Sequence, residues 1–371
     1  MLKRLARYAR RYPLVDHAID HARARMTARK HPEGIVPTAP SRIIVEPTNG
    51  CNLKCLYCGN KDMLRKATYL DLGIYEQLLD QMVEAKIPRL TLHTIGEPTL
   101  HPRIARMLSM AVERERCVVM STNGTRLREG LAREIVEASP DMINISVDTP
   151  DQETLDILRP GLKLDELLEN MRTFKRIRDE EGRVRESPWG PVRLPTITLT
   201  CVITKYFTRE AEGRFFELFG DLVDDFAFQF ANNHGSYVRE DDSAPRRPLP
   251  EGLRKRLYGA VRTPCVFLWD TLSLLSNGTV SACRFEFDAR VDVGRFPEQS
   301  LMELWRGEEM KRLRRAHMKF DFEGLDQCRD CSTMLYSSRV DHQVVTQRII
   351  ERNGFRPART GWLSSDPRQT T

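Results

Sequence analysis

Short runs of β-type residues alternate with longer stretches of helical periodicity over the first two thirds of the chain. Six runs are rich in β-branched or aromatic residues and are bounded by Gly, Pro, Asn or Asp, which predicts strands at 41–47, 89–93, 117–121, 142–147, 196–203 and 226–230. Apolar residues recur at helical spacing in 70–85, 103–114, 127–138, 164–177 and 210–219. This alternation predicts an α/β fold, a partial (β/α)6 TIM-like barrel with parallel strands and its chemistry at their C-terminal ends.

The predicted barrel takes residues 41–235, and the rest of the chain divides by composition and residue pattern into further segments. Residues 1–40 form a basic arm that we expect to be helical, and 236–263 are a polar, proline-rich linker. A hairpin-like run, a helix over 301–317 and two late cysteines predict a small second domain at 264–340, followed by a C-terminal helix and tail at 341–371. The charged, proline-rich residues 179–195 predict a long excursion before the fifth strand.

Charge and hydropathy limit the classes of function. Residues 1–30 carry nine Lys/Arg against two acidic residues, so they account for the whole net charge of +6, and the barrel has no basic field for nucleic acid. The arm packs on the barrel or contacts an anionic surface; we favour packing. No apolar run approaches the ~18 residues of a membrane span, and no secretory signal is evident, so we expect a cytoplasmic protein.

Seven of the nine cysteines fall into two groups, which in a cytosolic chain indicates metal or redox chemistry rather than disulfides. Cys51, Cys55 and Cys58 directly follow the first predicted strand. Three thiolates on one loop can hold three irons of a [4Fe–4S] cluster and leave the fourth iron open to a small chelating molecule. The alternative is zinc, which normally takes a fourth protein ligand, and no His or Cys follows at a suitable spacing.

This triplet, with the aromatic Tyr57 before its third cysteine, resembles the signature of the radical S-adenosylmethionine (SAM) superfamily. The resemblance implies that SAM chelates the open iron and is cleaved reductively to methionine and a 5′-deoxyadenosyl radical, which takes a hydrogen atom from a substrate carbon.

Later strand ends are similar to the superfamily's SAM-binding segments over about residues 41–234. The resemblance implies that Gly96 and Glu97 bind the methionine ammonium, although Ile95 stands where many members have glycine. It also implies SAM contacts from other strand ends: Tyr57 beside the cluster, Asn123 after the third strand, Ser146 and Asp148 near the ribose and carboxylate, Arg159 at the carboxylate, and Val202 against the adenine.

The second group comprises Cys265, Cys283, Cys328 and Cys331, and four thiolates close a cluster fully. With Trp269 and the 300–310 helix, it resembles the auxiliary-cluster domains called SPASM and, in shorter form, twitch. No cysteine follows Cys331 in this sequence, so the resemblance implies the twitch form with one auxiliary [4Fe–4S] cluster. A zinc ribbon built from the same four thiolates is the alternative.

The twitch arrangement is similar to that of enzymes that oxidise or epimerise hydroxyl-bearing carbons of aminocyclitol and sugar antibiotics. Related SPASM enzymes modify ribosomal peptides, often with an N-terminal peptide-recognition domain larger than the 40 residues that precede the first strand here. We therefore expect a small sugar-like substrate and a reducing donor such as flavodoxin or ferredoxin. A peptide maturase and a non-enzymatic electron-transfer protein remain alternatives.

Two candidates for later catalytic steps emerge. Cys201, late in the fifth strand, is a candidate hydrogen-atom donor for an epimerase, although strand alternation places it on the helix-facing side with Leu199. Cys117 starts the third strand, at the wrong end of a barrel for chemistry. His234, after the sixth strand, could bind hydroxyls or accept a proton, or could simply belong to a turn.

Overall fold

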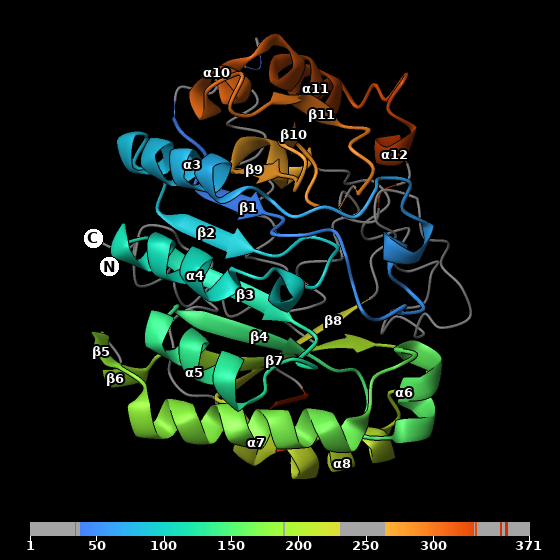
Figure 1. Ribbon diagram of the computed structural model, residues 1–371. Helices are drawn as coiled ribbons and strands as arrows, with labels where there is room; N and C mark the ends of the chain where they lie inside the picture. The colour runs from blue at the N-terminus through green and yellow to red at the C-terminus, as the bar shows by residue number, and fades with distance from the viewer. Residues whose placement is uncertain are drawn as a thin grey trace, which may run out of the picture.

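The computed structural model describes residues 34, 38–187, 190–230, 264–285, 287–329, 331, 349–350 and 353–354. Its centre is a run of six parallel strands in chain order (Figure 1). These are β1 (Arg42–Val45), β2 (Arg89–Leu92), β3 (Cys117–Thr122), β4 (Met142–Ser146), β7 (Thr196–Ile203) and β8 (Asp225–Phe230). The predicted α/β partial barrel is therefore confirmed.

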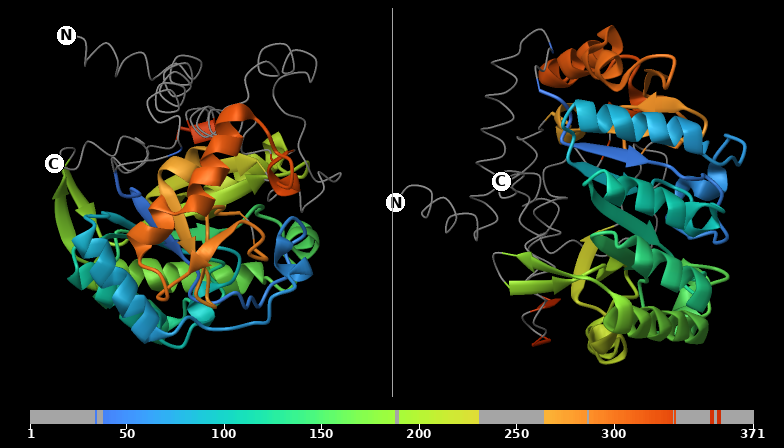
Figure 2. Two further views of the ribbon diagram at one scale, coloured as in Figure 1. Left: turned by 90° about the horizontal axis from the view of Figure 1, so that it is seen from above. Right: turned by 60° about the vertical axis from the view of Figure 1, so that its left-hand side comes forward.

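Helices connect these strands and cover the outer side of the curved sheet (Figure 2). They are α3 (Leu72–Glu84), α4 (Ile104–Glu113), α5 (Glu129–Ala138), α6 (Gln152–Leu158), α7 (Leu164–Glu181) and α8 (Arg209–Phe219). Local sequence sets their starts: the Asp71 carboxylate accepts the amides of Gly73 (2.8 Å) and Ile74 (3.0 Å), which caps α3. The short α6 was not predicted.

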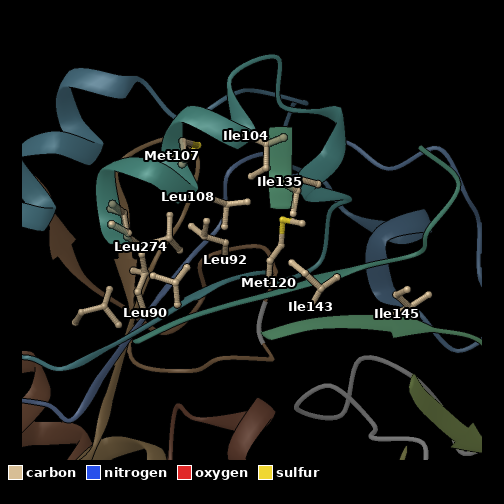
Figure 3. Packing of buried hydrophobic residues seen from close by; sticks show 14 of the residues in the cluster. Leu90, Leu92, Ile104, Met107, Leu108, Met120, Ile135, Ile143, Ile145 and Leu274 are labelled. Carbon is tan, nitrogen blue, oxygen red and sulfur yellow. The ribbon is translucent and has the colours of Figure 1, made fainter. Parts of the chain in front are cut away.

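The core lies between the sheet and these helices. Leu90 and Leu92 of β2 and Met120 of β3 are fully buried and pack with Ile104 and Leu108 of α4 (Figure 3). Because successive side chains of a strand point to opposite faces, the residues between these apolar positions line the inside of the barrel. Burial alternates accordingly along β2, β3 and β4.

The C-terminal region continues the barrel sheet. Strand β9 (Thr271–Leu274) pairs in parallel with β1, and β10 (Thr279–Ser281) and β11 (Asp292–Arg295) extend the sheet in antiparallel order. Gly278 has φ +84°, as the turn between β9 and β10 requires. The hairpin-like run is confirmed, and its strands extend the barrel sheet to nine strands.

The helix prediction at 301–317 was wrong in detail, whereas the excursion predicted at 179–195 is present and begins a few residues later. The helix expected at 301–317 is two helices, α10 (Leu301–Arg306) and α11 (Glu308–Lys319), because Gly307 takes extended backbone angles of φ −64° and ψ 165°. Residues 179–195 begin with the end of α7 and continue as an antiparallel pair, β5 (Val184–Ser187) and β6 (Gly190–Arg193). Short helical turns complete the list: η1 (Gly59–Asp62), η2 (Pro98–Leu100), η3 (Gly220–Leu222), η4 (Val266–Trp269) and α12 (Asp326–Arg329).

Most of the predicted basic arm, the linker at 236–263 and most of the C-terminal helix and tail lie outside the described residues. Within the described ranges, no helix has both the length and the apolar character needed to cross a membrane.

Candidate active site

The loop from Glu46 to Asp71, here called the cluster loop, carries the first cysteine group at the C-terminal end of β1. Cys51, Cys55 and Cys58 are partly buried free thiols. Backbone amides point at two of the sulfurs: Leu53 N lies 3.5 Å from Cys51 Sγ, and Asn60 N lies 3.5 Å from Cys58 Sγ. Such amide donors stabilise a thiolate, which is the form that binds metal.

Neighbouring strand ends hold the cluster loop in place. The amide of Glu97, after β2, donates to the Gly50 carbonyl at 2.8 Å. Asn123, after β3, donates its side-chain amide to Asn52 Oδ1 at 2.9 Å, directly beside Cys51. The parallel sheet thus brings the segments after β1, β2 and β3 to one edge, as the sequence predicted.

The thiols in this loop suit a cationic ligand. Burial raises the pKa of Cys51 and Cys55, and raises that of Cys58 to about 12. The charges of the neighbouring sulfurs add to this rise for Cys58. Arg159 Nη1, 4.0 Å from Cys55 Sγ, acts in the opposite direction on the pKa of Cys55. A thiol must lose its proton before it binds a metal ion, so metal binding at these three cysteines would release protons.

A buried network joins four of the predicted SAM contacts. Arg159 donates to both carboxylate oxygens of Asp148, at 2.6 and 3.1 Å, and the Val202 amide donates to Asp148 at 2.9 Å. The Tyr57 hydroxyl also donates to Asp148, and burial raises its pKa well above the usual value, so it keeps its proton. These residues come together as predicted, but they bind one another, and their contacts with SAM stay a prediction.

Glu97 forms a second buried network. Its carboxylate accepts the Thr99 amide (3.0 Å) and hydroxyl (2.6 Å), the Thr122 hydroxyl (2.7 Å) and the Asn123 amide (2.7 Å). Burial raises the pKa of Glu97 despite these donors. Glu97 thus fastens the end of β3 to the segment after β2, and its predicted contact with the methionine ammonium is untested. Ser146 is half-buried at the end of β4, on the inner face.

Gly96 allows the backbones to approach closely, which gives a testable expectation. A Cβ at Gly96 would overlap the Thr48 carbonyl oxygen and lie 2.8 Å from the Gly50 carbonyl oxygen. Gly96→Ala should therefore displace the cluster loop and sharply reduce both bound iron and SAM cleavage. Gly130→Ala is the matched control, because its Cβ would meet nothing within 4 Å and the helix should gain about 0.5–1 kcal/mol. Equal iron content in the two variants would contradict this expectation.

The second cysteine group comes from three segments: Cys265 precedes η4, Cys283 follows β10, and Cys328 and Cys331 lie in and after α12. Burial raises the pKa of Cys265 well above its ordinary value, and the charges of Cys283, Cys331 and Cys328 raise it further. The Cys265 amide donates to His317 Nδ1 at 3.3 Å. Among the described residues, no group of three His, Cys, Asp or Glu side chains has the arrangement that a single metal ion requires. An iron–sulfur cluster, in contrast, places each thiolate on a different iron.

Cys201 borders the Asp148 network, because its Sγ donates to the Asp148 carbonyl oxygen at 3.6 Å. Cys201 is fully buried among Leu199, Phe215 and Phe228 on the helix-facing side, as alternation predicted, and burial raises its thiol pKa well above the usual value. Its role as a hydrogen-atom donor stays a prediction. His234 lies outside the described residues.

Sequence reasoning missed Glu46 and Arg65, which bind each other in the cluster loop. The signal available was a carboxylate directly after an apolar strand.

A partial barrel with three cysteines after its first strand and four cysteines in its C-terminal extension defines an iron–sulfur enzyme of the SAM-cleaving class. The chain belongs to the radical SAM superfamily and carries a C-terminal SPASM domain: residues 45–180 match the model described as radical SAM superfamily, and residues 265–332 match the SPASM model, described as an iron–sulfur cluster-binding domain. Its cofactors are accordingly a [4Fe–4S] cluster with SAM and an auxiliary iron–sulfur cluster.

Curated relatives are similar over part of their length. The GTP 3′,8-cyclase of Bradyrhizobium diazoefficiens is 34% identical over 141 residues, which are 35% of this chain and 40% of the relative. The PqqA peptide cyclase of Gluconobacter oxydans is 30% identical over 113 residues, 30% of this chain and 31% of the relative. The chain thus spans well under half the length of these curated relatives.

Solved structures share the fold. SuiB of Streptococcus suis bound to precursor peptide SuiA has 15% identity and a TM-score of 0.61, covering 81% of this chain and 71% of that one. BtrN in complex with AdoMet and 2-DOIA has 17% identity and a TM-score of 0.52, covering 80% and 94%. For anSMEcpe with bound AdoMet, the identity is 16%, the TM-score 0.56 and the coverage 84% and 99%.

Proposed function

We propose that this protein is a radical SAM oxidoreductase that acts on a hydroxyl-bearing carbon of a small polar molecule of the sugar or aminocyclitol type, and that it oxidises or epimerises that carbon. The observation that carries the proposal is the polar inner face of the barrel. Half-buried residues with hydrogen-bonding side chains occupy inward positions on five strands: Thr91, Ser121, Asn144, Ser146, Thr200 and Gln229.

Hydroxyl, amide and carboxamide groups on a concave face suit a substrate with many hydroxyl groups, because each buried polar group needs a hydrogen-bond partner. The Asn144 side-chain amide already donates to Ser121 Oγ at 3.2 Å across two strands. This pair leaves the carboxamide oxygen of Asn144 and the hydroxyl proton of Ser121 available to orient a substrate. Val119 and Met142 are inward too, but they lie earlier along their strands, so the strand ends offer the apolar side chains of a peptide few partners.

We assign the ligands from the two cysteine groups. Cys51, Cys55 and Cys58 would hold the SAM-binding cluster, and Cys265, Cys283, Cys328 and Cys331 the auxiliary cluster. When bound, SAM and its cluster supply the 5′-deoxyadenosyl radical, and the auxiliary cluster supplies an electron acceptor. The Asp148–Arg159 pair, with Tyr57, lies beside Cys55, and Arg159 would bind the SAM carboxylate there.

Of the two outcomes, oxidation fits the described residues better. Epimerisation needs a donor that returns a hydrogen atom from inside the barrel, and Cys201 faces the helix layer instead. After the hydrogen atom is abstracted, oxidation needs an acceptor for one electron, which the auxiliary cluster would supply, and an acceptor for the hydroxyl proton, for which our candidate is His234, outside the described residues. Flavodoxin or ferredoxin would be the external reductant.

Comparison supports two substrate classes. BtrN, a small-molecule complex with AdoMet and 2-DOIA, favours the proposal, whereas SuiB bound to a precursor peptide illustrates the alternative of peptide modification. Both have low identity to this chain, so the polar inner face decides our preference.

Isotope transfer tests the proposal directly. Reconstituted, reduced protein is incubated with SAM and sugars or aminocyclitols deuterated at their carbinol carbons, and 5′-deoxyadenosine is examined by mass spectrometry. We expect one compound to stimulate SAM cleavage and to place deuterium in 5′-deoxyadenosine. A ketone product would indicate oxidation, and solvent hydrogen at an inverted carbon would indicate epimerisation. Label transfer from a leader-bearing peptide, but from none of these compounds, would reject the proposal.

A further inference from the structure

Glu46 is a fully buried carboxylate at the start of the cluster loop, and it accepts five hydrogen bonds. Arg65 binds it with two nitrogens, at 2.9 and 2.8 Å. The Thr94 hydroxyl, after β2, donates at 2.7 Å. Ser276, in the turn between β9 and β10, donates its amide at 3.0 Å and its hydroxyl at 2.8 Å. Glu46 therefore joins the barrel to the SPASM region.

Arg65 extends this connection to the segment 282–291 between β10 and β11, here called the auxiliary loop, which carries Cys283. Its Nε donates to the Phe287 carbonyl at 2.6 Å. The amides of Leu64 and Arg65 donate to Asp288 Oδ1 at 2.8 and 3.3 Å. One guanidinium thus contacts the end of β1 through Glu46 and the auxiliary loop through Phe287.

An aromatic contact lies beside this ion pair. The ring of Phe287 is buried and packs so closely on Gly59 that a Cβ there would overlap the ring. Gly59 directly follows Cys58, and Phe287 lies a few residues after Cys283 in the auxiliary loop. The two loops that carry cysteines of different clusters are therefore in direct contact. Figure 1 shows them on the same side of the sheet, the cluster loop in blue and the auxiliary loop in orange.

We propose that the Glu46–Arg65 ion pair is a positioning element that holds the cluster loop and the auxiliary loop in one fixed relation, and that it thereby sets the coupling between the two iron–sulfur clusters. The carboxylate is saturated by donors from three segments, so it has one arrangement in which every partner is satisfied. Because electronic and magnetic coupling fall steeply with separation, a small shift of either loop changes them. The proposal needs both clusters but does not depend on the identity of the substrate.

Variants of Arg65 separate this role from ordinary stabilisation. Arg65→Met leaves Glu46 buried without its cation, and Arg65→Lys keeps the charge but not the two-pronged geometry. The double variant Glu46→Gln/Arg65→Met removes both charges. Arg178→Met is the matched control: the Arg178 side chain is 2% exposed against 10% for Arg65, and it bonds Asp224 at 2.5 Å, but Asp224 lies just before β8, at the opposite ends of the strands from both loops.

Three measurements on the anaerobically reconstituted full chain decide the matter. Iron content shows whether both clusters are present. Electron paramagnetic resonance of the fully reduced protein reports the spin–spin broadening between the clusters. Amide hydrogen exchange reports the Leu64, Arg65 and Ser276 amides, which the network protects in the parent.

We expect Arg65→Met and the double variant to lose protection at Leu64 and Arg65 and at Ser276 together, and to lose spin–spin broadening, with Arg65→Lys intermediate at full iron content. Arg178→Met should lose protection near Ile197, whose amide bonds Asp224, and should keep the parental broadening. The proposal is overturned if Arg65→Lys and the double variant retain iron, broadening and protection like the control. Exchange that rises only at Leu64 and Arg65, or only at Ser276, would also overturn it.

Discussion

Replacing Cys51, Cys55 and Cys58 together with alanine should abolish SAM cleavage and lower the iron content from about eight to about four per chain, as expected for two four-iron clusters. The reason is geometric: these three sulfurs share one loop at the C-terminal edge of the barrel, whereas the other four cysteines lie in the extension beyond β8. Iron and sulfide are counted after anaerobic reconstitution, and 5′-deoxyadenosine is measured after chemical reduction.

Cys117→Ala serves as the control for this experiment. Cys117 is also partly buried and its pKa is raised by burial to about 12, but it begins β3 at the opposite end of the barrel. The Cys117→Ala variant should therefore keep about eight irons and full SAM cleavage. The C-terminal cysteines hold no iron–sulfur cluster if the unsubstituted protein binds about four irons and the triple variant binds none. Oxidation would then lose its electron acceptor.

The barrel could be predicted because its signals are local. Each of the six parallel strands is a short β-type run bounded by turn residues, and each outer face repeats at the spacing of a strand or a helix. The same alternation correctly placed Cys201 on the helix-facing side. The break at Gly307 was missed because a single glycine between two helical patterns does not reveal whether the backbone continues.

The pairing of β9 with β1 could not be predicted in this way. Nothing in Thr271–Leu274 specifies a partner more than two hundred positions earlier; the pairing depends on which sheet edge the barrel leaves free. The Glu46–Arg65 pair has the same origin, since Ser276 and Phe287 reach it only after β9 has joined β1. Cysteine spacing therefore identified the cofactors, whereas the connection between their loops required the tertiary structure.

Arg159→Met should be strongly destabilising. Arg159 and Asp148 are both buried, with side chains 7% and 0% exposed, and their ion pair at 2.6 Å lies beside Cys55. Removing the cation leaves a buried carboxylate without a counter-charge, which typically costs about 3–5 kcal/mol. For a chain of this length, that loss corresponds to a fall in Tm of about 4–6 °C. Differential scanning calorimetry of the reconstituted protein measures this fall in Tm.

Affinity for SAM should fall in the same variant, by about tenfold or more, if Arg159 donates a charge-assisted hydrogen bond to the SAM carboxylate. The double variant Asp148→Asn/Arg159→Met separates the two effects, because it removes the unpaired charge as well as the cation. Its Tm should recover most of the loss, while its affinity for SAM, measured by anaerobic equilibrium dialysis, should stay low. If affinity recovers together with Tm, Arg159 acts only by neutralising the charge of Asp148, and its assignment to the SAM carboxylate is wrong.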